Sequence, residues 1–163
     1  MIESTIEYKT NIINQLTELI EVRPSPIEGL GLFAKKFISK GTIWWTATPC
    51  DVLLINRDQY LTLKNSIESS SSQNFEQSIL VYSYYVLRYD ALVFCLDNSR
   101  YVNHSYKPNS GNTPDFHPFS SIALRDIFPG EEILEDYSTY DQCPWIIFNE
   151  NFLSQKPIHT PLI

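Results

Sequence analysis

The sequence predicts a mostly β protein with a few short helices. Short segments rich in β-branched and aromatic residues alternate with Pro, Gly, Asn and Ser along most of the chain, which is typical of strands and turns. Helical periodicity appears in two places, at residues 2–20 and from residue 75 onward. With 163 residues, of which 43% are hydrophobic, we expect residues 1–163 to form one domain with its own core.

The first elements are a helix and a strand. Residues 2–20 carry apolar side chains at near-helical spacing, which predicts a weakly amphipathic helix that packs on the main body. Residues 19–23 look extended, and Pro24 and Pro26 end this segment.

Two glycines precede the next strands. Gly29 and Gly31 bracket Leu30 in a loop with two permissive backbone positions, and the loop leads into an apolar strand at residues 32–34. Residues 42–48 are β-branched and aromatic, so they predict a further strand.

The central region allows two interpretations. Residues 66–73 form a serine-rich loop, and a helix starts at Phe75. Residues 84–88 and 92–96 either continue this helix or flank a short turn as a hairpin. We favour the hairpin, with the helix ending near Tyr82.

The C-terminal third supplies two more strands. Residues 120–127 predict one of them, and Pro129-Gly130 predicts a turn into a second at residues 131–137. We find no internal repeats.

The charge balance limits the partners. Twelve Lys and Arg against nineteen Asp and Glu give a net charge of −7, whereas binding to nucleic-acid phosphates requires a basic surface. We therefore expect no nucleic acid, and a basic peptide or protein suits the charge better. Apolar runs fall far short of the ~20 residues that span a bilayer, and residues 1–10 lack the basic start of a signal peptide. We expect an intracellular protein without a membrane partner.

The cysteines point to neither a disulfide framework nor a metal. They are three in number and contain no CxxC pair. We therefore expect no zinc site and a reducing compartment.

Three segments stand out, and each also has a purely structural interpretation. Residues 29–31 form a GxG that, taken alone, is only a common turn. Residues 100–109 place two asparagines and a histidine within seven positions, although a buried structural loop would also use such groups. Residues 129–137, taken alone, are a turn and an acidic strand that ends in a tyrosine.

Together and in this order, the segments resemble the motifs of the SET-domain family of protein lysine methyltransferases. Gly29-Leu30-Gly31-Leu32-Phe33-Ala34 is similar to the first motif, and Gly130-Glu131-Glu132-Ile133 to Asp136-Tyr137 is similar to the terminal tyrosine motif. The most specific part is Arg100-Tyr101-Val102-Asn103-His104-Ser105 followed by Pro108-Asn109. The resemblance covers roughly residues 18–145, and three ordered matches arise by chance far less often than one.

The resemblance implies a β-clip fold of small sheets. In that family the Asn-His loop and the terminal strand thread past each other in a knot-like arrangement beside the cofactor. S-adenosylmethionine binds on one face, the substrate lysine enters from the other, and a narrow channel joins them. By position, residues 51–90 would be a variable insert that shapes the substrate groove, and residues 141–163 would form a lid.

The resemblance also implies the cofactor-binding residues. By their positions in the motifs, the backbone around Glu28, Gly29 and Leu30 would contact S-adenosylmethionine. Asn103 and His104 would bind its amino-acid and adenine portions.

Three further aromatic positions are implied. Tyr137 would be the phenol of the lysine channel. Tyr85 would be a second channel tyrosine, with Tyr84 and Tyr82 as alternatives in the same stretch. Trp145 either stacks on the adenine or packs in the core.

The chemistry explains the need for such a channel. A lysine amine with a pKa near 10.4 is only ~0.1% neutral at pH 7.4, and only the neutral amine attacks a methyl group. Burial and a neighbouring sulfonium both lower this pKa, so no dedicated base is required.

Two departures from the family pattern stand out. Glu135 lies two positions before Tyr137, where many members carry a Phe or Tyr that helps set the number of methyl groups added. A carboxylate facing the channel would stabilise the ammonium, so we expect Glu135 to point away or another residue to fill that wall. The chain also lacks the cysteine-rich zinc segment that follows the domain in many members.

The sequence therefore predicts an S-adenosylmethionine-dependent protein-lysine N-methyltransferase. The substrate would be a protein or peptide that carries a lysine, with a histone among the candidates, and the protein would act in the cytoplasm, in the nucleus or in a host cell. The alternative is a SET-like module that binds the cofactor or a basic peptide without efficient catalysis. A third interpretation is methylation of an N-terminal amine or a small molecule.

Overall fold

The computed structural model describes residues 15–66 and 78–146, and within them the fold is mostly β with short helices, as predicted. Its elements in chain order are α1 (Leu16–Leu19), β1 (Ile20–Pro24), β2 (Leu30–Ala34), β3 (Ile43–Thr46), β4 (Val52–Asn56), α2 (Arg57–Ser66), β5 (Ser83–Val86), η1 (Leu87–Tyr89), β6 (Ala91–Cys95), η2 (Asn98–Tyr101), β7 (Asn103–His104), β8 (Ser110–Asn112), β9 (Ser120–Ala123), β10 (Glu132–Glu135) and η3 (Tyr137–Thr139).

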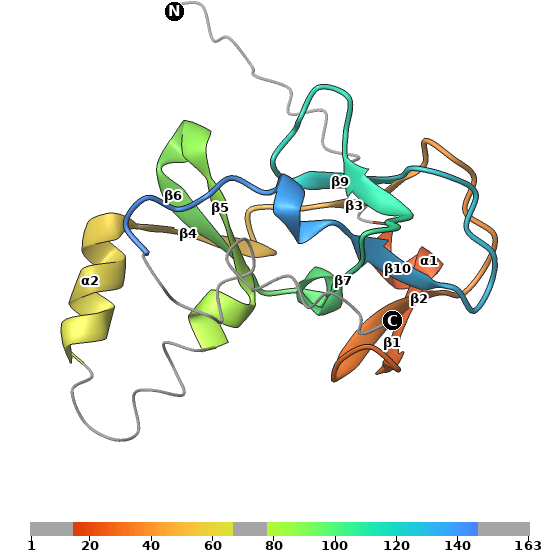
Figure 1. Ribbon diagram of the computed structural model, residues 1–163, viewed down its shortest axis with the longest axis horizontal. Helices are drawn as coiled ribbons and strands as arrows, with labels where there is room; N and C mark the ends of the chain where they lie inside the picture. Colours follow the sequence, from red (N-terminus) through yellow and green to blue (C-terminus); the bar gives the residue numbers. More distant parts are fainter. Residues whose placement is uncertain (1–14, 67–77, 147–163) are drawn as a thin grey trace, which may run out of the picture.

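The described strands form small sheets with the orders β1-β2-β10-β7, β3-β9-β8 and β4-β6-β5 (Figure 1). In the first sheet, β10 is antiparallel to β2 and parallel to β7. This pairing places the glycine loop, the Asn-His strand and the terminal motif side by side, although about 100 residues separate the first from the last. The knot-like threading of this region stays a prediction.

A buried asparagine makes hydrogen bonds to the backbone of β10. Asn109 is 2% exposed, and its Nδ2 donates to the carbonyl oxygen of Glu132 at 2.7 Å. Its Oδ1 accepts from the backbone N of Leu134 at 2.8 Å, and its own backbone N donates to the carbonyl oxygen of Leu134 at 3.1 Å. The carboxamide thus supplies the hydrogen bonds that a further strand would make, which keeps β10 in register.

The apolar side chains gather in two clusters. The first lies around α1, β2, β3 and β9, and the second lies around α2, β5, β6 and residues 143–146. Strand β6 joins them, because Cys95 packs in the first cluster and Leu92 in the second. Helix α2 lies beside β4 at one end of the molecule, and β1 and β2 lie at the other (Figure 1).

The hairpin interpretation of the central region is confirmed. β5 and β6 pair antiparallel from Ser83↔Phe94 to Val86↔Ala91, and residues 78–81 are helical, so the helix ends before Tyr82. Residue 90, between the two strands, has a φ of 44°, a left-handed conformation that Asp tolerates better than most residues.

Other boundaries differ from the prediction by a few residues or were not predicted. Of the helix expected at residues 2–20, only α1 lies within the described residues, and Ile20 already belongs to β1. The serine-rich loop falls almost wholly outside them. Strand β4 and helix α2 were not predicted, because residues 51–66 mix apolar and polar side chains without a clean period.

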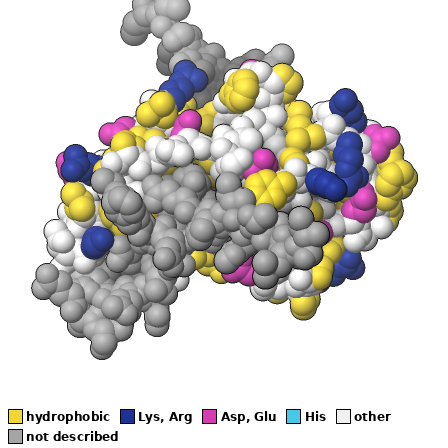
Figure 2. Space-filling view, in the orientation of Figure 1, with side chains coloured by type: hydrophobic (Ala, Val, Ile, Leu, Met, Phe, Trp, Pro, Cys, Tyr) yellow, Lys and Arg dark blue, Asp and Glu magenta, His cyan; other side chains and the backbone are white. Residues whose placement is uncertain are grey.

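Charges of both signs mix on the surface. Figure 2 shows basic and acidic side chains next to each other at the end that carries β1 and β2, on the face it presents. Two ion pairs there are Arg23 with Glu21 at 3.4 Å and Arg125 with Glu131 at 3.1 Å. Within the described part of the chain, no helix is long and apolar enough to span a membrane.

Candidate active site

A cavity of about 500 Å³ lies where the two clusters meet. We call it the aromatic cavity, because aromatic rings make up much of its wall: Trp44, Trp45, Tyr82, Tyr84, Tyr85, Phe116, Tyr137 and Tyr140. Trp44 and Trp45 belong to the first cluster and Tyr85 to the second. The cavity therefore depends on the packing of both.

Tyr137 lies on this wall and contacts the Asn-His strand. It begins η3, is 8% exposed, and its hydroxyl donates to the carbonyl oxygen of Val102, the residue before Asn103. Burial raises the pKa of Tyr137, and the charge of Glu135 adds to the effect. The phenol stays protonated at neutral pH and keeps its hydrogen to donate.

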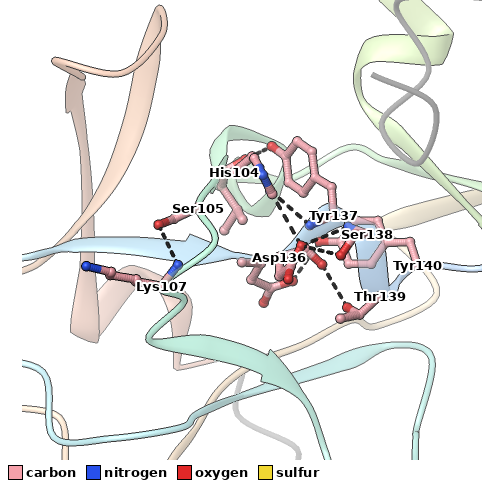
Figure 3. A network of polar contacts seen from close by, with 10 residues as sticks. His104, Ser105, Lys107, Asp136, Tyr137, Ser138, Thr139 and Tyr140 are labelled. Carbon is pink, nitrogen blue, oxygen red and sulfur yellow. Dashed lines mark hydrogen bonds and ion pairs between the residues drawn. The ribbon is translucent and has the colours of Figure 1, made fainter. Parts of the chain in front are cut away.

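His104 holds the backbone of Tyr137 in place. Its Nδ1 accepts from the backbone N of Tyr137 at 3.1 Å, and Asp136 Oδ1 is farther away, at 3.9 Å (Figure 3). His104 Nδ1 cannot accept a hydrogen bond from Tyr137 N and donate one to Asp136 at the same time. The contact with Tyr137 is the shorter one, so Nδ1 is the acceptor. The geometry therefore assigns the proton of a neutral His104 to Nε2.

Asp136 caps the short helix that follows. Its Oδ1 accepts from the backbone N of Ser138 at 3.0 Å and from the hydroxyl of Ser138 at 2.7 Å, and its carbonyl oxygen accepts from Thr139 Oγ1 at 2.7 Å (Figure 3). These local bonds fix the turn that directs Tyr137 into the cavity.

Asn103 ties the Asn-His strand to the glycine loop. Its Nδ2 lies 3.1 Å from the carbonyl oxygen of Glu28, 3.2 Å from that of Leu30 and 2.8 Å from Glu132 Oε1. A side chain at Gly31 would disturb this arrangement, since a Cβ there would lie 2.2 Å from Glu132 Oε1. Glycine is required at position 31 because the Glu132 side chain lies so close to its backbone, not because of its backbone angles.

Glu135 lines the aromatic cavity, so the expectation that it points away is wrong. It is 6% exposed, and its Oε1 accepts from Ser110 Oγ while its Oε2 accepts from Tyr140 OH, each at 2.7 Å. Ser110 Oγ in turn accepts from Trp44 Nε1 at 2.8 Å. Both carboxylate oxygens are held by donors from neighbouring elements, which explains how a buried Glu is tolerated here.

The tyrosines of β5 point to different places. Tyr84 lies 5.8 Å from Tyr140 between ring centroids, and its hydroxyl donates to the carbonyl oxygen of Pro118 at 2.5 Å. Tyr85 also lines the cavity, but its hydroxyl donates to Asp90 at 2.7 Å. The role of Tyr85 as a channel tyrosine stays a prediction, and the ring of Tyr84 is the one beside Tyr140.

Trp145 packs in the second cluster. Its ring lies 5.5 Å from that of Tyr60 and 6.0 Å from that of Tyr85, and its Nε1 donates to Asp90 Oδ1 at 2.9 Å. These contacts hold the half-buried Trp145 against the second cluster, and stacking on adenine stays a prediction.

Two residues of the site were missed in the sequence. Ser110 and Tyr140 orient Glu135, but neither lies in a motif that the resemblance covers. The available signals were weak: Ser110 directly follows Asn109, and Tyr140 follows Tyr137 by three positions.

Metal-binding side chains do not cluster within the described part of the chain. No three His, Cys, Asp or Glu side chains among residues 15–66 and 78–146 gather to hold a metal ion. Cys50 is exposed and Cys95 and Cys143 are buried, and all three are free thiols.

Small sheets that bring a glycine loop, an Asn-His strand and a buried tyrosine together beside an aromatic cavity define the SET class of domains. A profile of the SET domain matches residues 29–138. The chain belongs to the SET-domain family.

Comparison with solved structures agrees with this fold. A chain of polycomb repressive complex 2 from Chaetomium thermophilum, in a structure bound to S-adenosylmethionine, matches with a TM-score of 0.54 and 20% identity over 76% of this chain. A chain of an active polycomb repressive complex 2 in the stimulated state matches with a TM-score of 0.53 and 23% identity over 72%. This chain spans only 16% and 15% of those chains.

A third structure is of a Plasmodium falciparum protein proposed to be a histone methyltransferase. It matches with a TM-score of 0.47 and 20% identity over 74% of this chain and 93% of its own. A search of curated proteins finds no match.

The residues around Asn103 fit S-adenosylmethionine. Three acceptors lie within 3.2 Å of Nδ2, and among the described residues no hydrogen bond ends on Oδ1, which leaves that oxygen to accept from an ammonium. Gly29 has a φ of +49° and open space where a Cβ would be, and Leu30 is 42% exposed. An accessible backbone next to a carboxamide oxygen that can still accept suits the amino-acid portion of the cofactor.

Proposed function

We propose that this protein is an S-adenosylmethionine-dependent protein-lysine N-methyltransferase. The observation that supports this most is the position of Tyr137, whose ring lines the aromatic cavity while its hydroxyl contacts the strand that carries Asn103. One phenol thereby borders both the side suited to a lysine and the side suited to the cofactor. The substrate class we propose is a lysine-bearing protein or peptide, such as a histone.

The residues of the chain would favour the neutral amine by excluding water. The rings of Tyr84, Tyr137 and Tyr140 line the cavity, and a lysine amine that leaves water there loses hydration of its charged form. The Tyr137 hydroxyl and the Val102 carbonyl oxygen would orient the nitrogen lone pair. S-adenosylmethionine would supply the activated methyl group.

Replacing Tyr137 by Phe tests this proposal. The variant keeps the ring but loses the hydroxyl, so methyl transfer should fall about a hundredfold or more. Cofactor affinity should stay within about threefold of wild type, because Asn103 and the glycine loop are unchanged. Transfer is measured with radiolabelled cofactor on mixed core histones, and affinity by isothermal titration calorimetry.

Tyr89→Phe is the matched control, since Tyr89 is 44% exposed and lies outside the residues that line the cavity. It should transfer methyl groups at the wild-type rate. Wild-type transfer by a folded Tyr137→Phe protein would remove Tyr137 from the reaction.

A second candidate function is a SET-like module that binds without transferring. Glu135 favours it, because a carboxylate on the cavity wall stabilises the ammonium form of a bound lysine. The two candidates separate in one assay: a module retains a lysine peptide or the cofactor but leaves labelled methyl groups on neither histones nor cell-lysate proteins.

A further inference from the structure

Strand β4 is an edge strand with one unpaired side. Its sheet has the order β4-β6-β5, so within the described part of the chain β4 pairs with β6 alone. The backbone N of Leu96 donates to the carbonyl oxygen of Asp51 at 2.8 Å, which makes Asp51 and Leu96 a hydrogen-bonded pair. Such pairs occur at every second position of an antiparallel ladder. The N–H and C=O groups of Val52 and Leu54 therefore point away from β6.

This unpaired side lacks the features that prevent edge strands from pairing. Natural edges carry a charge, a proline or a bulge, but β4 has the sequence Val-Leu-Leu-Ile-Asn and pairs with β6 without a register shift. Leu53 and Leu54 point to opposite faces of the sheet, and they are 50% and 48% exposed. Apolar surface therefore borders the edge on both faces.

The unpaired segment ends at Asn56. The backbone N of Asn56 donates to Gln59 Oε1, and the backbone N of Gln59 donates to Asn56 Oδ1, each at 2.9 Å. This reciprocal cap starts α2 and occupies the Asn56 N–H. Four backbone groups, the N–H and C=O of Val52 and of Leu54, remain to pair with another strand.

A second copy of the same strand matches these four groups. In an antiparallel pair with two-fold symmetry, Val52 of each copy lies opposite Leu54 of the other, and all four groups on both copies form hydrogen bonds. The two Leu53 side chains then lie opposite each other on one face. On the other face, each Leu54 packs against the Val52 of its partner.

The charges at the two ends of β4 also favour a second copy. Asp51 precedes the strand and Arg57 follows it. Arg57 is exposed, and no carboxylate of residues 15–66 and 78–146 lies within ion-pair distance of it. Antiparallel pairing brings Asp51 of each copy to the end where the other copy has Arg57, on a diagonal that an arginine side chain spans. Opposite charges thus meet at both ends of the interface.

We propose that two copies of this protein form a symmetric dimer in which their β4 strands pair antiparallel. The two three-stranded sheets would join into one, with β5 at both outer edges. Because β5 carries Tyr84 and Tyr85, both aromatic cavities would be attached to the same sheet. The inference goes beyond methyl transfer, since neither cofactor nor substrate takes part. A single short strand gives a small interface, so we expect a dissociation constant of about 10–100 μM.

The first experiment measures the mass of the full chain in solution. Analytical ultracentrifugation from about 1 μM to about 500 μM should show mostly monomer at the low end and mostly a species of twice the monomer mass at the high end. A monomer at every concentration would overturn the proposal, and an extended segment of another protein would then be the better occupant of this edge.

The second experiment locates the interface. Amide hydrogen exchange is followed by NMR at about 20 μM and about 1 mM. Exchange at Val52 and Leu54 should slow about threefold or more at the higher concentration, because their N–H groups become hydrogen-bonded only in the dimer. Slow exchange at both concentrations would mean that another part of the same chain covers the edge, and it would overturn the proposal.

The third experiment removes one hydrogen-bond donor from the edge. In Leu54→Pro, the N–H that points away from β6 is lost, whereas the ladder with β6 keeps its hydrogen bonds. The variant should therefore fold, which thermal unfolding checks, and stay monomeric at about 500 μM. A folded Leu54→Pro protein that dimerises like wild type would overturn the assignment to β4.

The fourth experiment reverses a charge without changing the backbone. In Arg57→Glu, like charges meet at both ends of the interface, so dimerisation should weaken at least about tenfold. Adding Asp51→Asn removes this repulsion and keeps an acceptor for the backbone N of Thr48, so affinity should return to within about fivefold of wild type.

Lys64→Glu is the matched control, because Lys64 is exposed on the same helix and the net charge changes equally. It should dimerise within about twofold of wild type. Equal affinities of a folded Arg57→Glu protein and of Lys64→Glu would overturn the proposed pairing. None of these measurements depends on methyl transfer, so their failure leaves the proposed enzyme standing.

Discussion

Four groups near Glu135 stay protonated at neutral pH. Burial is the main cause that raises the pKa of Tyr84, Tyr137 and Tyr140, and it raises the pKa of the Cys95 thiol to about 12. Each of these groups therefore stays neutral up to about pH 9. A pH dependence of methyl transfer below that value does not come from these four groups.

This makes the effect of Glu135 on the reaction predictable. A carboxylate beside the amine stabilises the ammonium and raises its pKa, so wild type needs a higher pH to form the neutral nucleophile. In Glu135→Gln the acid limb of the pH–rate profile should move down by about one unit, so that transfer at pH 7 rises up to about tenfold relative to transfer at pH 9. Single-turnover rates at saturating peptide, from about pH 6 to pH 9, measure this shift.

Glu18→Gln should keep the wild-type profile, since its exposed carboxylate lies on α1. A uniform loss of rate at every pH in Glu135→Gln, with no shift of the limb, would mean instead that Glu135 accepts the proton.

A second residue-scale prediction concerns Gly31. In Gly31→Ala, the new Cβ would lie 2.2 Å from Glu132 Oε1, so this oxygen must move away. Asn103 Nδ2 then loses its shortest contact. Cofactor affinity should fall about tenfold, because the carboxamide is no longer held in one orientation. The melting temperature should change little, since the clashing atom is the end of a flexible side chain. Calorimetry with S-adenosylmethionine and thermal unfolding measure the two effects.

Gly41→Ala provides the control for glycine replacement itself. Gly41 has a φ of +83° and open space around it, so alanine there adds backbone strain of about 1 kcal/mol without a clash. It should lower stability and leave cofactor affinity unchanged. Wild-type affinity in Gly31→Ala would show that Glu132 does not position Asn103.

At the scale of elements, β10 depends on the side chain of Asn109 for some of its backbone hydrogen bonds. In Asn109→Ala, the carbonyl oxygen of Glu132 and the backbone N of Leu134 both lose a buried partner. Leaving such groups unpaired costs about 1–3 kcal/mol each, so we expect unfolding free energy to drop by about 3 kcal/mol. Urea denaturation followed by tryptophan fluorescence measures this loss.

Asn98→Ala is its counterpart on the surface, because Asn98 is exposed at the start of η2. It should change stability by less than about 0.5 kcal/mol. If the two variants lose equal stability, the carboxamide of Asn109 is not what holds β10.

Some of the elements could be predicted from the sequence, and others could not. The β5–β6 hairpin and the turn before β10 were predicted, because short apolar runs bounded by Asp90 or by Pro129-Gly130 have few other local solutions. Helix α2 was missed, because most of its side chains are polar and form no clear apolar face, and Tyr60 alone of its residues is buried.

The candidate site also contains residues that the sequence predicted and residues that it did not. Asn103, His104 and Tyr137 lie in motifs with fixed spacing, so their proximity followed from the resemblance. Which tyrosine of β5 lies beside Tyr140, and where the Glu135 side chain points, depend on the packing of β5 and β8 against the terminal segment. Spacing along the chain contains no information about such long-range contacts.

At the scale of the whole molecule, the two apolar clusters meet at the aromatic cavity. Strand β6 runs from one to the other, with Leu92 in the second cluster and Cys95 in the first, and it pairs with both β4 and β5. A rigid strand shared by two clusters should couple their stabilities, so that the described residues unfold as one unit.

Leu80→Ala tests this coupling. Leu80 is fully buried in the second cluster, and its truncation should cost about 3 kcal/mol. If the clusters unfold together, hydrogen exchange should accelerate by a similar factor in β3 and β9 of the first cluster as in β4 and β6, even though the mutation lies in the second. Leu124→Ala, at a residue that is 39% exposed, should leave exchange in all four strands close to wild type. Acceleration confined to β4 and β6 would show that the clusters unfold separately, and the wall of the aromatic cavity would then open while the glycine loop stays folded.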